Sequence, residues 1–192
     1  MNENYEKYVE IIREKLDDFR FTHSLAVADR AVELAEKYGA DKEKAYLAGL
    51  LHDITKNLSK DEQLQFFGSS AIMLSNVEKA SPKVWHAISG ACYIKNVLKI
   101  ADSEIINAVR YHTTGRENMS LLEKVVYIAD FTSIDRNYTD VDILRAKVNE
   151  NLNDGIIYAL RYTINSLSEK NQVIHPDTLS AYNQLLCEGM LK

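Results

Sequence analysis

The stretch LAGLLHDITK, residues 47–56, places His52 and Asp53 side by side at the end of a strongly apolar segment. Asp41 precedes this segment and is suited to cap a helix that carries the apolar side chains of Leu47 and Leu50. A helix this apolar is expected in a protein core. A buried Asp and a buried His must be paired, hydrogen-bonded or bound to a metal, because isolated charge in a core is too costly.

Helical periodicity continues on both sides of this stretch. Apolar residues recur at helical spacing, and Gly39, Gly68 and Gly115 stand where helices are expected to end. Ser59 with Glu62, and Ser120 with Glu123, have the spacing of capping boxes, and Ser81-Pro82 resembles a further helix start. We find no alternating strand pattern and no internal repeat. The sequence predicts an all-α fold, a single domain over residues 1–192, with roughly nine or ten helices.

The composition excludes several classes of protein. With 192 residues, 7 Gly and 2 Pro, the chain is neither collagen-like nor of low complexity. Its 2 Cys cannot form a disulfide framework or a four-cysteine zinc site. A net charge of −5 argues against binding long nucleic acid, and no stretch approaches the ~18 apolar residues of a membrane span. We therefore expect a cytoplasmic protein that binds neither nucleic acid nor membrane.

Four of the five histidines lie on or near the ends of different predicted helices: His23 opens the second, His52 ends the third, and His86 and His112 lie near two later ends. A single such His is more often a cap, or a favourable charge at the helix dipole. Together with Asp53 and Asp130, however, they have the spacing of ligands that converge in a bundle core. Imidazole and carboxylate donors without thiolates suit Fe(II), Mn, Co, Ni or Zn, which predicts metal-assisted hydrolysis.

Cationic side chains accompany these residues. Arg20 precedes His23 by three residues, Lys56 follows Asp53 by three, and Arg136 follows Asp130 by six. Taken alone, Lys56 and Arg136 are each compatible with an ordinary solvated surface. Taken together, the three side chains predict a basic ring around the metal, which suits a substrate rich in phosphate.

The pattern H…HD…H…H…D, formed by His23, His52-Asp53, His86, His112 and Asp130, resembles the HD-domain superfamily of metal-dependent phosphohydrolases. The similarity extends further, to the YqeK-type family of bacterial symmetrical diadenosine tetraphosphate hydrolases. It is carried by FRFTHSLAVADRAVELA at 19–35, LLHDITK at 50–56, AVRYHTTG at 108–115, LLEKVVYIADF at 121–131 and IHPDT at 174–178. The similar blocks cover residues 19 to 183, and HTTG before YIAD is their most specific feature.

The resemblance implies an iron enzyme with one ion that cuts diadenosine tetraphosphate into two ADP. The metal ligands it implies are His23, His52, Asp53 and Asp130. It implies that Lys56, His86 and His112 take part in catalysis, with the two histidines as phosphate donors or a general acid for the leaving ADP. The substrate contacts that it implies are Arg20, His23, Lys56, His86, His112, Thr113, Asp130, Arg136, Val173, Ile174, His175 and Pro176.

Several alternatives stay open. Ile134 stands where the family commonly has Pro, which bears on the rigidity of the turn before Arg136. His86 and His112 are also suited to a second metal. An HD-type nucleotidase or phosphodiesterase, and a nucleotide-binding regulatory module, are the competing functions. The sequence does not decide between an adenosine and a guanosine nucleotide, and the Tyr-rich C-terminal helices are a candidate homodimer interface.

Overall fold

The computed structural model describes residues 3–191, which form eleven α-helices and one short 3-10 helix and contain no β-strand. The predicted all-α class is confirmed, and the number of helices is slightly above the predicted nine or ten. The helices are α1 (Glu3–Lys15), α2 (Asp18–Tyr38), α3 (Lys42–Leu51), α4 (Lys60–Ser69), α5 (Asn76–Ala80), α6 (Trp85–Asn96), α7 (Ser103–Tyr111), α8 (Leu121–Thr132), α9 (Val141–Glu150), α10 (Leu152–Glu169) and α11 (Pro176–Met190), with the 3-10 helix η1 (Pro82–Val84) between α5 and α6.

The predicted capping signals form as expected. The Asp41 carboxylate accepts the backbone N–H groups of the first turn of α3. Both predicted capping boxes are present, at Ser59 for α4 and at Ser120 for α8. Gly39 ends α2 with φ 81°, a left-handed conformation that glycine adopts without a steric penalty. Local side-chain chemistry therefore sets most of the helix boundaries.

One helix and two boundaries differ from the prediction. The additional helix is α5, which begins at a capping box of Ser75 with Glu78. Ser81 makes no side-chain capping bond, because its φ of −123° and ψ of 69° lie outside the extended region of an N-cap. The 3-10 helix η1 follows Ser81, and α6 begins only at Trp85. Helix α2 begins at Asp18, so His23 lies inside α2 and does not open it.

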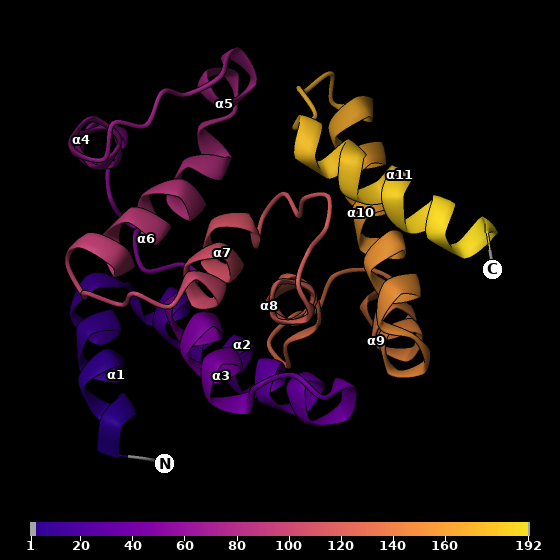
Figure 1. Ribbon diagram of the computed structural model, residues 1–192, viewed down its shortest axis with the longest axis horizontal. Coiled ribbons are helices and arrows are strands. Elements are labelled where there is room, and N and C mark those ends of the chain that lie inside the picture. Colours follow the sequence, from indigo (N-terminus) through magenta and orange to yellow (C-terminus); the bar gives the residue numbers. More distant parts are fainter. Residues whose placement is uncertain (1–2, 192) are drawn as a thin grey trace.

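Helix α8 lies at the middle of the molecule, with α1–α7 on one side and α9–α11 on the other (Figure 1). It packs against α2, α3, α7 and α10, and α3 also packs closely on α2. Leu50 and Leu51 of α3 are fully buried, as the apolar stretch predicted. A Cβ on Gly49 would lie 2.9 Å from Cα of Ala28, so only glycine allows this approach of α3 to α2. The end of α3 is therefore fixed deep in the core.

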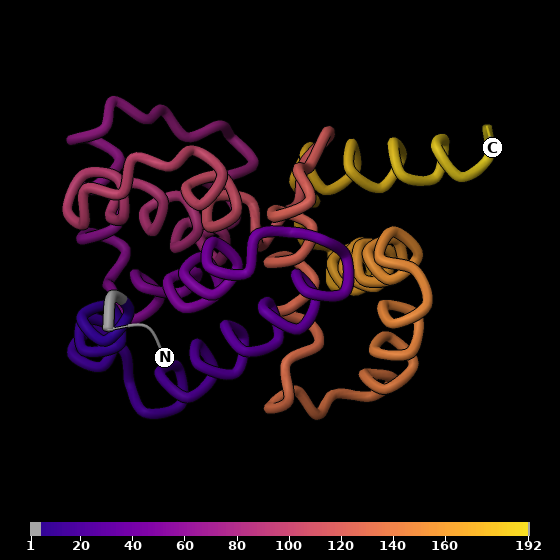
Figure 2. The backbone as a smooth tube through the Cα atoms, turned by 60° about the horizontal axis from the view of Figure 1, so that its bottom comes forward, coloured from indigo at the N-terminus to yellow at the C-terminus, as the bar shows by residue number. Residues whose placement is uncertain are grey.

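Helix α11 follows the chain's last turn and runs outward along the far side of the molecule, and its C-terminal end extends away from the rest of the chain (Figure 2). Its first residues contact the turn that follows α7, because the Thr178 hydroxyl donates to the backbone oxygen of Thr114 at 2.9 Å. None of the helices within residues 3–191 combines the length and the apolar character that crossing a bilayer requires.

Candidate metal centre

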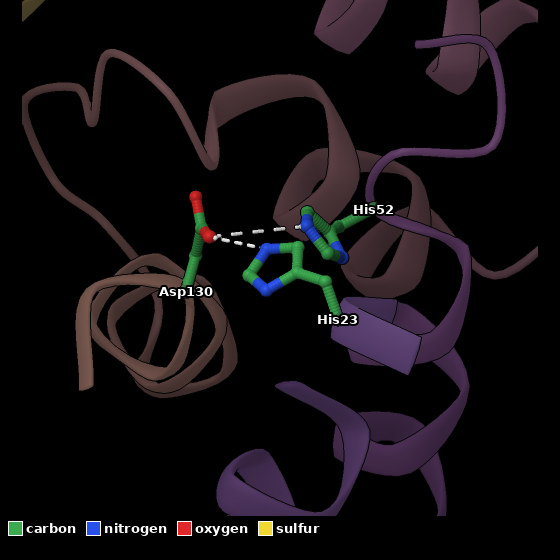
Figure 3. A group of neighbouring side chains, drawn as sticks. All are labelled: His23, His52 and Asp130. Atoms are coloured by element: carbon green, nitrogen blue, oxygen red, sulfur yellow. Dashed lines mark hydrogen bonds and ion pairs between the residues drawn. The ribbon is translucent and has the colours of Figure 1, made fainter. Parts of the chain in front are cut away.

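Four of the predicted ligands meet where α2, the end of α3 and α8 come together. His23 and His52 are 1% and 0% exposed, and Asp53 is 2% exposed. Nε2 of His23 lies 2.9 Å from Oδ1 of Asp130, and Nε2 of His52 lies 3.9 Å from the same oxygen (Figure 3). His52 Nε2 is also 3.6 Å from Oδ2 of Asp53. The structure thus brings His23, His52, Asp53 and Asp130 together.

The imidazoles of His52 and His112 are oriented in the manner of metal ligands. Nδ1 of His52 donates to the backbone oxygen of Gly49, and Nδ1 of His112 donates to that of Val109, each at 2.7 Å. These bonds fix the tautomer and turn the Nε2 lone pair of each ring toward the centre. Burial lowers the pKa of His52 to about 3, so its ring is neutral at ordinary pH. Nε2 of His52 is buried and has no hydrogen-bond partner among the described residues.

The donor set fits a divalent metal ion. Two groups of three donors each have their ligand atoms within 4.8 Å of one another: His23, His52 and Asp130, and His52, Asp53 and His112. His52 belongs to both groups, which is consistent with its unpartnered nitrogen. His112 joins the second group, a position that the sequence resemblance did not assign to it. Nitrogen and carboxylate donors of this kind suit Fe, Mn, Co, Ni or Zn.

The carboxylates are held ionised. Burial alone would raise the pKa of Asp53, but the adjacent rings of His52, His112 and His86 keep it well below its ordinary value. Burial would likewise raise the pKa of Asp130, but its contact with His23 and the charge of Arg136 keep that pKa well below its ordinary value. Both carboxylates therefore present negative oxygens to a cation.

Three cationic side chains surround the centre, as the spacing predicted. Arg20 donates to Oδ2 of Asp53 at 3.0 Å, and Lys56 Nζ lies 3.6 Å from Oδ1 of the same carboxylate. Arg136 donates to a side-chain oxygen of Asp130 and, through Nε, to its backbone oxygen at 2.7 Å. Burial lowers the pKa of the Lys56 ammonium, against the opposing charge of Asp53. The carboxylate charge of the centre is balanced by cations that face it.

His86 differs from the other histidines of the site. The partners of its ring are side chains: Nε2 lies 3.0 Å from Nζ of Lys56, 3.1 Å from Nε2 of His112 and 3.1 Å from Oδ1 of Asp53. Burial lowers the pKa of His86 to about 4. It belongs to neither group of metal donors. Its ring is placed next to the centre without the backbone bond that orients a ligand.

The remaining predicted contacts lie in the turn after α7 and at the start of α11. Thr113 follows His112, and its hydroxyl is buried without a hydrogen-bond partner among the described residues. His175 caps α11 and lies 3.7 Å from Oε1 of Glu78. Val173, Ile174 and Pro176 flank it, and Val173 lines a cleft of about 350 Å³ between residues 80–83 and 171–173.

Two functional features were missed by the sequence analysis. Nδ1 of His23 donates to Oδ2 of Asp135 at 2.7 Å, so a carboxylate outside the centre orients this ring. Arg145 of α9 donates to the backbone oxygens of Thr132, Ser133 and Arg136 at 3.2, 2.7 and 2.9 Å, and so holds the turn that carries Ile134 and Asp135. The only signal in the sequence for the bond between His23 and Asp135 was an Asp five residues after Asp130. Nothing in the sequence indicated the role of Arg145.

Comparisons with known proteins identify the family of the chain. The family model of the HD domain matches residues 20–135. The chain is 38% identical to the symmetrical bis(5'-nucleosyl)-tetraphosphatase of Halalkalibacterium halodurans, with 96% of this chain and 98% of that protein covered. It is 36% identical to the protein of the same name from Bacillus subtilis, over 95% of this chain and 98% of that one.

A solved structure is similar over almost the whole chain. A predicted HD superfamily hydrolase involved in NAD metabolism, from Clostridium acetobutylicum, superposes with a TM-score of 0.93 at 36% identity and covers 96% of this chain and 97% of its own. The chain therefore belongs to the HD-domain superfamily and, within it, to the family of the symmetrical bis(5'-nucleosyl)-tetraphosphatases.

Proposed function

We propose that this single-domain chain is a metal-dependent hydrolase that cuts diadenosine tetraphosphate symmetrically into two ADP. The observation that carries the proposal is the ring of Arg20, Lys56 and Arg136 around a buried His and Asp centre. Cleavage of a phosphoanhydride requires neutralisation of charge on the phosphoryl oxygens as well as a nucleophile in line with the leaving group. The names of the relatives from Halalkalibacterium halodurans and Bacillus subtilis support this substrate.

His23, His52, Asp53 and Asp130 hold the metal in this proposal. A divalent ion bound there supplies Lewis-acid charge and a water acidified for attack on phosphorus. Iron is the ion that we propose, as one ion per chain; Mn, Co, Ni and Zn suit the same donors. The unpartnered Nε2 of His52 is the atom in this chain that most directly requires such a ligand.

The cations bind the phosphate chain. Arg20 and Arg136 grip phosphate oxygens through their guanidinium forks, and Lys56 acts as a point charge. Each now faces a carboxylate of the centre, so substrate oxygens replace or extend an interaction that already exists. Thr113 donates its unpartnered hydroxyl to a phosphate oxygen. Charge neutralisation is thereby supplied from several elements that converge on one place.

His86 and His112 border the leaving half of the substrate. Their Nε2 atoms are 3.1 Å apart, next to Lys56. Because Nδ1 of His112 donates to Val109, its Nε2 carries a lone pair, so His86 is the ring that can donate a proton to an oxygen bound there. The segment Val173–Pro176 closes over the nucleoside of the same half, next to the cleft that Val173 lines. GDP-like halves are included in the proposal beside ADP.

The proposal is tested by measuring turnover and metal content together. His52→Ala should lose both the ion and the release of ADP. His86→Gln should keep the ion, measured by inductively coupled plasma mass spectrometry, and lower turnover. Loss of metal in His86→Gln would favour a second ion held by His86 and His112. Tight nucleotide binding without turnover in the metal-loaded wild type would overturn the enzyme and favour a regulatory module.

The cellular setting and the assembly are part of the same proposal. Cys92 and Cys187 are both unpaired, as thiols in a reducing cytoplasm are. A homodimer through the C-terminal helices is proposed on the exposure of Tyr162 on α10 and of Leu179 and Met190 on α11. Sedimentation velocity measures it directly, and a monomer at micromolar concentration would contradict it.

A further inference from the structure

Phe19 is a large aromatic side chain that remains 63% exposed beside the metal centre. It lies in the first turn of α2, one turn before His23. Its ring is nearly parallel to the His23 ring, with an interplanar angle of 8° and a centroid separation of 6.4 Å. One face of Phe19 is therefore directed toward a proposed metal ligand, and much of the rest of the ring is open to solvent.

Phe19 ends a series of neighbouring rings that runs through the centre. The ring centroids of His23 and His52 are 5.3 Å apart, those of His52 and His112 are 5.0 Å apart, and those of His112 and His86 are 5.1 Å apart. Phe19 is thus at one end of the series and His86 at the other. The two ends differ in character, since His86 is buried and Phe19 is exposed.

The substrate requires two nucleoside sites, and this step rests on the proposed function. Symmetrical cleavage places the reacting phosphates at the centre with one ADP half extending to either side. The half next to His86 and Val173–Pro176 has a nucleoside site in that proposal. The other nucleoside must leave the centre toward the opposite end of the ring series, where Phe19 lies.

The surroundings of Phe19 fit a base attached to phosphate. The Arg20 guanidinium donates to Oδ2 of Asp53 at 3.0 Å and has its carbon 5.4 Å from the Phe19 ring centroid. It therefore places a cation between the carboxylates and the aromatic ring, where a phosphate joined to a stacked nucleoside would pass. On the same side, Ile134 is 85% exposed and adjoins Asp135, the partner of His23.

We propose that Phe19 is the stacking platform for the base of the second nucleoside. An aromatic ring stacks on any purine, because every base offers a π-face and no hydrogen-bond readout is involved. This end of the site therefore accepts adenine and guanine alike. The end of the site at His86 and Val173–Pro176, which we call the enclosed end, holds one half of the substrate. Phe19 binds the other half.

The test compares two uncleavable ligands on the metal-loaded protein. One is diadenosine tetraphosphate with a methylene group in place of the central bridging oxygen, and the other is adenosine 5'-tetraphosphate with the same replacement. Phe19→Ala should weaken binding of the dinucleotide about tenfold, or ~1.4 kcal/mol, by isothermal titration calorimetry. It should leave binding of the mononucleotide unchanged, because its one nucleoside occupies the enclosed end. Met73→Ala, at a residue that is 95% exposed, should change neither.

A second variant gives a direct signal of stacking. The chain has 1 Trp, the buried Trp85, so Phe19→Trp adds an exposed indole whose fluorescence a stacked base quenches. Saturable quenching by the dinucleotide and not by the mononucleotide is expected. An unaltered dinucleotide affinity in Phe19→Ala, or equal losses for both ligands, would overturn the stacking platform. A wild type that binds neither ligand would instead overturn the proposed function itself.

Discussion

Asp135 accepts a hydrogen bond from Nδ1 of His23 at 2.7 Å, across 112 positions of sequence. The opposite nitrogen of the same ring faces Oδ1 of Asp130 at 2.9 Å. His23 is therefore held between a carboxylate that orients it and a carboxylate that shares its proposed ion. A carboxylate behind a ligating imidazole fixes the ring and raises its basicity as a ligand.

Removal of this carboxylate should weaken metal binding. We expect Asp135→Ala to lower the affinity for Mn(II) about 10–100-fold, because the His23 ring loses its orienting partner. Asp135→Asn should lose less, since its amide oxygen still accepts from Nδ1. Competition with a chromogenic chelator measures the Mn(II) affinity of both variants. Asp140→Asn makes the same chemical change outside the centre and should match the wild type; an unchanged affinity in Asp135→Ala would contradict the assigned role.

Gly49→Ala should displace the end of α3. The added Cβ meets backbone atoms of α2, with Cα of Ala28 at 2.9 Å and the oxygen of Val27 at 3.1 Å. Overpacking of this kind costs about 1–3 kcal/mol of unfolding free energy. The Gly49 carbonyl also orients His52, so metal retention should fall as well. Urea denaturation measures the loss of unfolding free energy.

Gly68→Ala is the control for this substitution, because nothing lies within 4 Å of a Cβ at that position. Gly68→Ala should leave the free energy of unfolding unchanged or raise it.

Arg145 holds the turn that carries Ile134. Its guanidinium holds three backbone oxygens of residues 132–136, the turn from which Asp135 and Arg136 reach the centre. We expect Arg145→Met to raise KM for the dinucleotide several-fold, with a smaller loss of kcat, because Arg136 is released from its position. Steady-state kinetics at saturating metal measures the change in KM separately from the change in kcat. Equal kinetics for Arg145→Met and the exposed Arg161→Met would argue against this role.

The pH dependence of stability should reveal the contribution of Glu78, which links α5 to Arg110 of α7 and to His175, the residue that caps α11. Burial alone would raise its pKa, but hydrogen bonds from Ser75 and the charges of Arg110 and His175 hold it below its usual 4.5. A lowered folded-state pKa contributes stability that is fully present above 4.5 and is lost as the pH falls through the folded value.

The comparison for this prediction is Glu78→Gln, which keeps a residue type suited to the capping box while removing the charge. The Tm of the wild type should exceed that of the variant at neutral pH, and the difference should narrow between about pH 5 and pH 3. Differential scanning calorimetry across that range measures it. A difference that is constant with pH would mean that the charge of Glu78 contributes nothing.

The helices and most of the centre were predictable because their signals are local. Capping boxes such as Ser59 with Glu62, and the apolar stretch before His52, act within a few residues. Helix α5 was missed because its five residues are too few for an apolar period. Asp135 and Arg145 could not be assigned, because each acts through a loop whose contacts depend on how α8 and α9 pack. The orientation of His112 as a ligand likewise depends on a backbone bond that no residue pattern encodes.

The position of cleavage tests the central claim most directly. The metal-loaded protein should be incubated with diadenosine tetraphosphate and its products separated by ion-exchange chromatography. ADP as the only nucleotide product is predicted, because the phosphate chain is centred on the metal between Arg20 and Arg136 on one side and His86 on the other. ATP together with AMP would contradict symmetrical cleavage and the placement of the two nucleosides at opposite ends of the site.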